Sequence, residues 1–259
     1  MAGSRYPLLR YGQVLAEARR SYDPQKSAAE ARSEWLAAKL YRPASFWVTP
    51  LFLAFGFSAD GVTVASIAVS VAMPAVALMC GGHAYLAVVA CGLCVQVLDC
   101  VDGNIARMTR RFSSLGDMLD GLATLFFWAA YFAALGVATQ EQHAGWVGAH
   151  GELVGLVLAV LLLAQREVED TSRQYLGTSV DWGAGKAASS RIDLNRYGKL
   201  LEHLVAFGGL ASAGAAGRLN WLLAAVAAYQ AALLLFWVAR FVASARARRR
   251  VTAEPRRYD

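Results

Sequence analysis

The chain has few charged residues for its length and far fewer cysteines than a disulfide-rich domain. Charged residues make up 17% and hydrophobic residues 57% of its 259 positions, whereas soluble globular chains average about 25% charged and 45–50% apolar residues. This composition excludes an ordinary soluble domain, and it excludes a disordered chain because disorder requires low hydrophobicity. The four cysteines are too few for a small domain held together by disulfides.

Long apolar runs take the place of the missing charge. Six of them are separated by short polar stretches, which predicts an all-α polytopic membrane protein with six transmembrane helices. Several runs are shorter than the roughly 20 residues that an isolated span needs, so we expect neighbouring helices to share their burial. The runs are Val62–Met79, Ala84–Val101, Gly121–Ala138, Leu153–Gln165, Leu200–Gly217 and Trp221–Val242.

The basic residues are sorted to one side of these spans. Segments 1–61, 102–120, 166–199 and 240–259 hold 24 of the 25 Lys and Arg residues, and Arg218 is the exception. By the positive-inside rule this predicts an inner-membrane protein with both termini in the cytoplasm. A basic cluster directly after a span is expected to fix topology and to touch anionic lipid, so no nucleic-acid partner is expected.

We divide the chain into three parts: an N-terminal cytoplasmic or interfacial segment (1–45), a six-helix transmembrane domain (46–242) and a basic cytoplasmic tail (243–259). In the first part, Ser27–Leu40 predicts an amphipathic helix on the membrane interface that Pro43 ends. A solvated helix without a special role is the alternative for this segment.

Four of the few acidic residues gather at one membrane boundary. Asp99 and Asp102 stand three residues apart at the cytoplasmic end of the second span, and Asp117 and Asp120 repeat that spacing at the start of the third. Residues at this spacing share a helix face, and a hairpin between the spans would turn the two pairs toward each other. Facing carboxylates repel unless a divalent cation lies between them, and oxygen ligands favour Mg²⁺ or Mn²⁺. All four are therefore candidate metal ligands.

Glycine and arginine accompany these carboxylates. Gly103 leaves room for close approach to the backbone, and Arg107, Arg110 and Arg111 bring positive charge to the same rim. Carboxylates, a hard metal and arginines together indicate a site for a phosphate or diphosphate ester and displacement at phosphorus. A loop that only sets topology, with capped helix ends, is the alternative.

These residues also carry a resemblance to a known family. The pattern is Asp99-x2-Asp102-Gly103-x2-Ala106-Arg107-x8-Gly116-x3-Asp120. It resembles the signature of the CDP-alcohol phosphatidyltransferases. The resemblance implies a membrane transferase of phospholipid biosynthesis, in which an acceptor alcohol attacks a CDP-alcohol, expected to be CDP-diacylglycerol, and CMP is released. It also implies a homodimer.

The resemblance implies roles for individual residues. The signature aspartates match the family's ligands for two Mg²⁺ or Mn²⁺ ions: Asp99, Asp102 and Asp120. The family's nucleotide-binding positions correspond to Gly103, Ala106 and Arg107. Thr63 matches the threonine with which the family enters its first span.

The acceptor is expected near the long loop that begins at Arg166, because the family's acceptor alcohol enters near that face. The basic residues of this loop suit an anionic acceptor, although topology alone predicts positive charge there as well. Glu202 and His203 lie near the start of the fifth span, and we interpret them as an interior-facing polar pair. A role for either as a base, or in positioning another site residue, is the alternative.

One position departs from the family signature. The family has a fourth aspartate, its proposed general base, where this chain has Thr124. A threonine hydroxyl accepts no proton near neutral pH, and general-base catalysis is worth about 10²–10⁴-fold. Asp117 is a possible substitute, although it lies two turns away, roughly 10 Å along the axis.

Thr124 is also consistent with two hypotheses that need no substitute carboxylate. The acceptor can be acidic enough to need no protein base, or the chain is a silent relative that binds CDP-lipid without turnover. A cation transporter is a third hypothesis for the whole chain, but the carboxylates cluster at one boundary and do not continue toward the outer face.

Overall fold

The structure is a computed structural model that describes residues 11–23, 28, 35–142, 145–176 and 203–253. Within these ranges every regular element is helical, which confirms the predicted all-α fold. The helices are α1 (Tyr11–Arg20), η1 (Ala37–Tyr41), α3 (Arg42–Ala54), α4 (Ala59–Cys80), η2 (Gly81–His83), α5 (Ala84–Thr109), α6 (Ser114–Gln140), α7 (Gly145–Ala149), α8 (Gly151–Leu176), η3 (Leu204–Gly209), α10 (Leu210–Ala215) and α11 (Leu219–Ala253).

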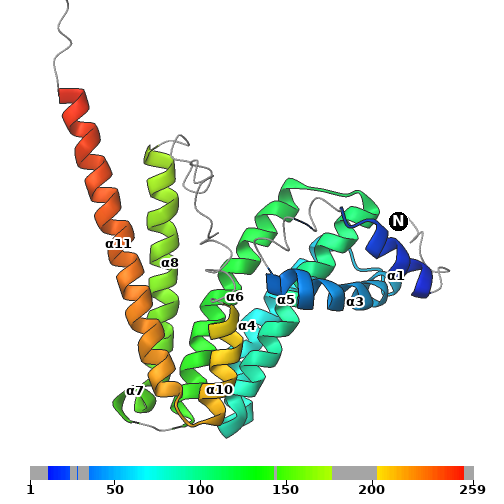
Figure 1. Cartoon of the computed structure of the whole chain (residues 1–259), viewed down its shortest axis with the longest axis horizontal. Helices are drawn as coiled ribbons and strands as arrows, with labels where there is room; N and C mark the ends of the chain where they lie inside the picture. The colour runs from blue at the N-terminus through cyan, green and yellow to red at the C-terminus, as the bar shows by residue number, and fades with distance from the viewer. Residues whose placement is uncertain (1–10, 24–27, 29–34, 143–144, 177–202, 254–259) are drawn as a thin grey trace, which may run out of the picture.

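Helices α4, α5 and α6 form the centre of the molecule. Helix α4 packs against both α5 and α6, while α8 packs against α6 and α11 against α8. Helix α10 lies against α5, and α3 crosses the other end of α5 with α1 packed on it (Figure 1). The signature residues at the junction of α5 and α6 therefore lie at the end of the bundle that α1 and α3 cover.

Three helical stretches in the described part of the chain are long and apolar enough to cross a membrane: Ala59–Thr109, Ser114–Gln140 and Leu219–Ala243. The first of them contains α4 and α5, which reverse direction at η2. Helix α8 and the pair η3–α10 lie where the fourth and fifth spans are predicted, and the fifth predicted span begins outside the described residues. The polytopic membrane architecture is thus confirmed, and the number of six spans stays a prediction.

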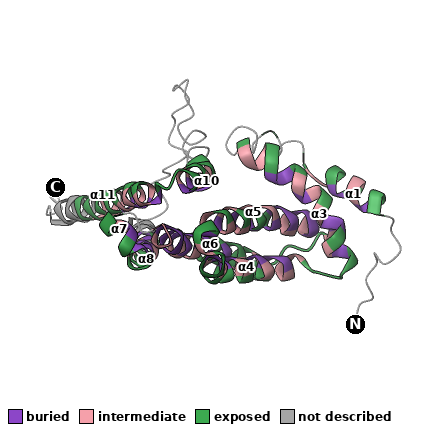
Figure 2. Cartoon of the chain, turned by 90° about the horizontal axis from the view of Figure 1, so that it is seen from below, coloured by how far each residue is buried: buried purple, intermediate pink, exposed green. Residues whose placement is uncertain are grey.

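Burial is uneven between the helices. The buried residues concentrate where α4, α5 and α6 face one another, as the colouring in Figure 2 shows. By contrast, only 11% of the residues in the most apolar stretch of α11 are buried. Leu235 and Phe236 on that helix are 69% and 54% exposed. A soluble chain rarely exposes a continuous apolar surface of this extent, and a bilayer solvates it.

Local chemistry sets the turn between α5 and α6. Helix α5 ends at Arg110, whose φ of 53° is left-handed, and the N–H of Arg111 bonds the carbonyl of Ala106 at 3.1 Å, as in a Schellman ending. Helix α6 then begins at Ser113, whose Oγ accepts the N–H of Gly116 at 2.9 Å and caps the helix. The two ends fold the signature into the predicted hairpin.

The prediction that Pro43 ends the interfacial helix is wrong. Helix η1 continues directly into α3, and Pro43 lies in the first turn of α3, where its missing N–H needs no helical partner. Half of the predicted segment Ser27–Leu40 lies outside the described residues, which here include only residues 28 and 35–40. Helix α1, which was not expected, packs against α3.

Candidate functional site

Two of the candidate aspartates, Asp99 and Asp120, lie within electrostatic range of a third, Asp102. Asp99 and Asp102 lie near the end of α5 and Asp120 lies one turn inside α6. The carboxylates of Asp99 and Asp120 both interact electrostatically with that of Asp102. Asp117 lies in the first turn of α6 and is exposed. It is not among the charges that act on Asp102. Its negative charge is instead stabilised by the dipole of α6, whose positive end lies at this turn.

The donor set fits a hard divalent cation by its chemistry, because carboxylate oxygens are the ligands that Mg²⁺ and Mn²⁺ prefer. Among the described residues, however, no three His, Cys, Asp or Glu side chains lie close enough together to hold a metal ion. Like charges repel, so three carboxylates need a cation to draw them closer. The ligand assignment to Asp99, Asp102 and Asp120 stays a prediction.

Thr63 orients Asp102. This residue of α4 is 5% exposed, and its Oγ1 donates a hydrogen bond of 2.7 Å to Oδ2 of Asp102, 39 residues away. A hydrogen bond to a charged acceptor is stronger than one between neutral groups, and it fixes one oxygen of the carboxylate. The matched threonine at the start of the first span thus contacts the predicted metal site directly.

Replacing Thr63 by valine is expected to reduce activity about 10–100-fold, because partners that orient ligand carboxylates contribute that much. The measurement is the rate of CMP release and its dependence on Mg²⁺ concentration. Thr139→Val is the matched control, since the buried Thr139 hydroxyl bonds only within its own helix, to the Leu135 carbonyl at 2.7 Å. Equal rates for the two variants would contradict this role of Thr63.

Asp60 is a carboxylate at this site that the sequence did not single out. A Cβ added to Gly116 would lie 3.2 Å from Oδ1 of Asp60 and 3.2 Å from Oγ of Ser113. The first turns of α4 and α6 therefore meet at Gly116, and a larger residue there would displace Asp60 or break the helix cap.

The space that Gly103 leaves by lacking a side chain is occupied by the Arg107 side chain. A Cβ at Gly103 would lie 3.3 Å from Nη1 and 3.4 Å from Nη2 of Arg107, so the guanidinium group of Arg107 lies over the glycine. Ala106, which precedes Arg107 in the signature, is half-buried. The glycine thus permits a particular placement of the signature arginine.

Asn104 is the hub of a buried polar network. Its side chain is 0% exposed, and its Oδ1 accepts hydrogen bonds from Nη2 of Arg107 at 2.8 Å and Nη1 of Arg42 at 3.5 Å. Its Nδ2 donates to Oγ of Ser45 at 2.9 Å and Oγ1 of Thr49 at 3.0 Å. Those two hydroxyls already donate to backbone carbonyls of α3, so they accept from the amide and fix its orientation. Asn104 thereby joins α5 to α3 and holds Arg107.

Tyr22 covers the two arginines of this network. The guanidinium carbons of Arg42 and Arg107 lie 4.9 Å and 5.4 Å from the centre of the Tyr22 ring, within the range of cation–π attraction. Tyr22 also contacts Phe46 edge-on, with ring centres 5.9 Å apart. The segment that follows α1 therefore closes over the arginine of the signature, which no sequence pattern had indicated.

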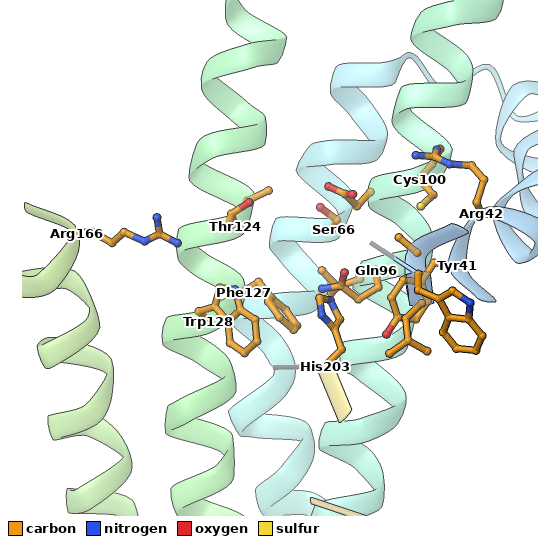
Figure 3. A pocket seen from close by; sticks show the side chains of 16 residues that line it. Tyr41, Arg42, Ser66, Gln96, Cys100, Thr124, Phe127, Trp128, Arg166 and His203 are labelled. Carbon is orange, nitrogen blue, oxygen red and sulfur yellow. The ribbon is translucent and has the colours of Figure 1, made fainter. Parts of the chain in front are cut away.

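A cavity of about 320 Å³ lies beside the aspartates. Asp99, Thr124 and Arg166 line it together, so two predicted site residues from different helices share one space with a predicted metal ligand. Figure 3 shows Arg166 on α8 and Thr124 on α6 at one side of the cavity, and Arg42 at the other. Aromatic rings form much of the remaining wall: Trp35, Tyr41, Phe127, Trp128 and His203.

The hydroxyl of Thr124 is directed into its own helix. Its Oγ1 donates to the carbonyl oxygen of Asp120 at 3.2 Å, and the residue is exposed. Arg166, the first residue of the predicted acceptor loop, lies in α8. From residue 177 to residue 202 the chain lies outside the described residues, so Glu202 and most of that loop do not enter the geometry.

The helical fold, the apolar spans and the aspartates at one end define a membrane protein with a polar site at the boundary of its bundle. A family model described as CDP-alcohol phosphatidyltransferase matches residues 57–192, more than half of the 259 residues. The chain therefore belongs to the CDP-alcohol phosphatidyltransferase family. No curated protein matches the chain.

Membership confirms the resemblance drawn from the signature. Its members are CDP-alcohol phosphotransferases: they transfer the alcohol together with its phosphate from a CDP-alcohol to an acceptor alcohol. The family generally depends on a divalent metal. The matched range contains Thr63, the whole signature from Asp99 to Asp120, and Arg166. It ends before His203, which nevertheless lines the same cavity.

Proposed function

We propose that the chain is an active transferase that moves a phosphatidyl group from a CDP-alcohol, CDP-diacylglycerol in the first instance, to an acceptor alcohol with release of CMP. The observation that carries this proposal is the cavity that Asp99, Thr124 and Arg166 line together. It gives an acceptor a place beside the aspartates, as transfer between two bound alcohols requires.

On the donor side, Asp99, Asp102 and Asp120 would hold Mg²⁺ or Mn²⁺, with two ions expected. The metal would supply positive charge to the diphosphate and to the leaving CMP. Arg107, held by Asn104 at 2.8 Å, adds a fixed cation at the same end of α5. The acceptor oxygen attacks the phosphorus that bears the donor's alcohol, and the bond from that phosphorus to CMP breaks.

On the acceptor side, the cavity favours an anionic alcohol. Arg166 at one side of it is exposed, and a guanidinium group binds phosphate or carboxylate oxygens through two parallel hydrogen bonds. Arg42 at the other side is held by Asn104 and adds positive charge. The aromatic wall between them would limit the access of water to the reacting phosphorus and so protect the transfer against hydrolysis.

The membrane setting is part of the proposal. The sorting of basic residues supports both termini, and with them the aspartates, on the cytoplasmic side of an inner membrane. Only 11% of the residues in the most apolar stretch of α11 are buried, so this helix offers a face against which a second copy of the chain would pack in a homodimer.

The test is a CMP-release screen with purified protein, several CDP-alcohols and several neutral and anionic acceptors, with and without Mg²⁺ or Mn²⁺. We expect CMP release that requires both metal and acceptor and that is greatest with an anionic acceptor. Metal-replete protein that releases no CMP with any donor and acceptor would contradict the proposal.

A silent CDP-lipid binder is the second candidate, favoured by the hydroxyl of Thr124, which bonds its own helix at 3.2 Å where the family has a carboxylate. A binder would hold the CDP-lipid without turnover and gain CMP release on Thr124→Asp, by about 10²-fold or more. For an active transferase we expect the opposite: turnover by the unaltered chain, with Thr124→Asp changing the rate less than about tenfold. Comparing CMP release by the two proteins separates the candidates.

A further inference from the structure

The acceptor hydroxyl must lose a proton during the proposed transfer, and Thr124 does not take it. A base has to lie in the space the acceptor occupies, within hydrogen-bond reach of the reacting hydroxyl. The cavity that Thr124 lines is therefore the place to search. This inference rests on the proposed transferase function.

Few side chains of the cavity accept a proton near neutral pH. The arginines stay charged, and thiols and phenols keep their protons; burial, and then Cys100, raise the pKa of Tyr41 to about 12. Among the described lining residues this leaves Asp99 and His203. Asp99 interacts electrostatically with Asp102 and belongs to the predicted metal ligands, so in the proposed transferase its carboxylate would hold the metal.

His203 is held at the cavity wall by two rings from different elements. Its ring centre lies 5.8 Å from that of Tyr41 in η1 and 6.0 Å from that of Phe207 in η3. In Figure 3 its ring reaches into the space between Phe127 and Tyr41, below the level of Thr124 and Ser66. The imidazole thus packs at a tilt against these two rings, on the wall of the cavity that Thr124 also lines.

The backbone at this place is also unusual. η1 (Ala37–Tyr41) and η3 (Leu204–Gly209) are both π-helical, and both adjoin the cavity, through Tyr41 and through His203 at the N-cap of η3. Single π-helical turns are rare and are frequent at functional sites, where they re-aim a side chain. Two such turns adjoin His203, and this backbone geometry is an observation independent of which side chains can accept a proton.

We propose that His203 is the general base of the transfer, in place of the carboxylate that Thr124 replaces. A neutral ring nitrogen of His203 takes the hydroxyl proton of the acceptor as the acceptor oxygen forms its bond to phosphorus. The bond from phosphorus to CMP breaks, CMP leaves with the electron pair, and the proton on the imidazolium passes to solvent before the next turnover.

The test compares two variants of the full-length protein. His203→Phe keeps a ring against Tyr41 and Phe207 and removes the base, while His203→Ala leaves room for added imidazole. His150→Ala is the control. His150 directly follows α7, is exposed, and stacks on Trp146 with ring centres 4.9 Å apart. It does not line the cavity. Thermal unfolding in detergent checks that each variant is folded.

We expect kcat of His203→Phe and His203→Ala to fall about 10²-fold or more, with the acceptor KM changed less than about threefold. Imidazole should raise the rate of His203→Ala in proportion to its concentration, and acceptors with more acidic hydroxyls should be affected less. Adding Thr124→Asp to His203→Phe should recover at least about tenfold, since it returns a carboxylate to the family's base position.

Two results overturn the assignment while leaving the transferase intact: His203→Phe within about fivefold of the unaltered chain, or a slow His203→Ala that imidazole does not accelerate. An unaltered chain that releases no CMP overturns the proposed function and the base assignment together. The activity of the unaltered chain therefore separates the two failures.

Discussion

Replacing Asp102 by asparagine is expected to lower metal-dependent CMP release at least about a thousandfold. Asp102 is the carboxylate that Thr63 fixes at 2.7 Å and that interacts electrostatically with both Asp99 and Asp120, so it is central to the predicted ligand set. A metal ion supplies several kcal/mol of charge stabilisation in the transition state, and about 4 kcal/mol corresponds to three powers of ten in rate.

This prediction has a readout besides activity. Binding of Mn²⁺, measured by its paramagnetic resonance signal in the purified protein, should weaken in Asp102→Asn at least about tenfold, as expected when one ligand oxygen loses its charge. Glu152→Gln is the control, because Glu152 lies in the first turn of α8, about four turns before Arg166 on the same helix. An Asp102→Asn protein that keeps more than a tenth of both properties would contradict the site.

Replacing Asn104 by leucine is expected to destabilise the protein by about 3 kcal/mol. The change removes the acceptor that Arg107 and Arg42 share and the donor to Ser45 and Thr49. Leaving charged donors without a buried acceptor costs several kcal/mol. Activity should fall as well, because Arg107 loses the group that holds it.

Thermal unfolding in detergent measures this effect, and Ser70→Ala is the matched control. Ser70 is buried to 0% exposure like Asn104, but its hydroxyl bonds only the Ser66 carbonyl in its own helix, at 2.9 Å. We expect a large fall in Tm for Asn104→Leu and little change for Ser70→Ala. Similar values for the two variants would show that the network between α3 and α5 contributes little.

The helical spans and the aspartate site could be predicted because their causes are local in sequence. An apolar run such as Trp221–Val242 has to be helical wherever lipid surrounds it, and it lies within α11 as observed. The spacing of Asp99 and Asp102 puts them on one helix face, and the capped turn at Arg110 and Ser113 brings Asp120 across from them.

The parts that could not be predicted depend on contacts between distant residues. Asn104 meets Ser45 59 residues away, and nothing in either local sequence indicates the other. The same holds for Tyr22 over Arg107. The prediction for Pro43 failed because proline in a first helical turn and proline after a helix look alike in sequence, and only the backbone distinguishes them.

His203 shows the limit most clearly. In sequence it stands 79 positions from Thr124, beyond the range of the family match, and a lone histidine near a span is by default a structural one. The tertiary structure places both residues on the wall of one cavity. That placement turns an unassigned histidine into a candidate for the role that Thr124 does not fill.

The most direct test of the proposed transfer follows a phosphorus label from donor to product. The label is placed on the phosphate that bears the diacylglycerol of CDP-diacylglycerol, and the purified protein receives Mg²⁺ and an anionic acceptor alcohol. We predict that the label appears in a phosphodiester with the acceptor, in amounts equal to the CMP released. Label that stays in the CDP-lipid, or that appears only in phosphatidic acid formed by hydrolysis, would contradict the transfer.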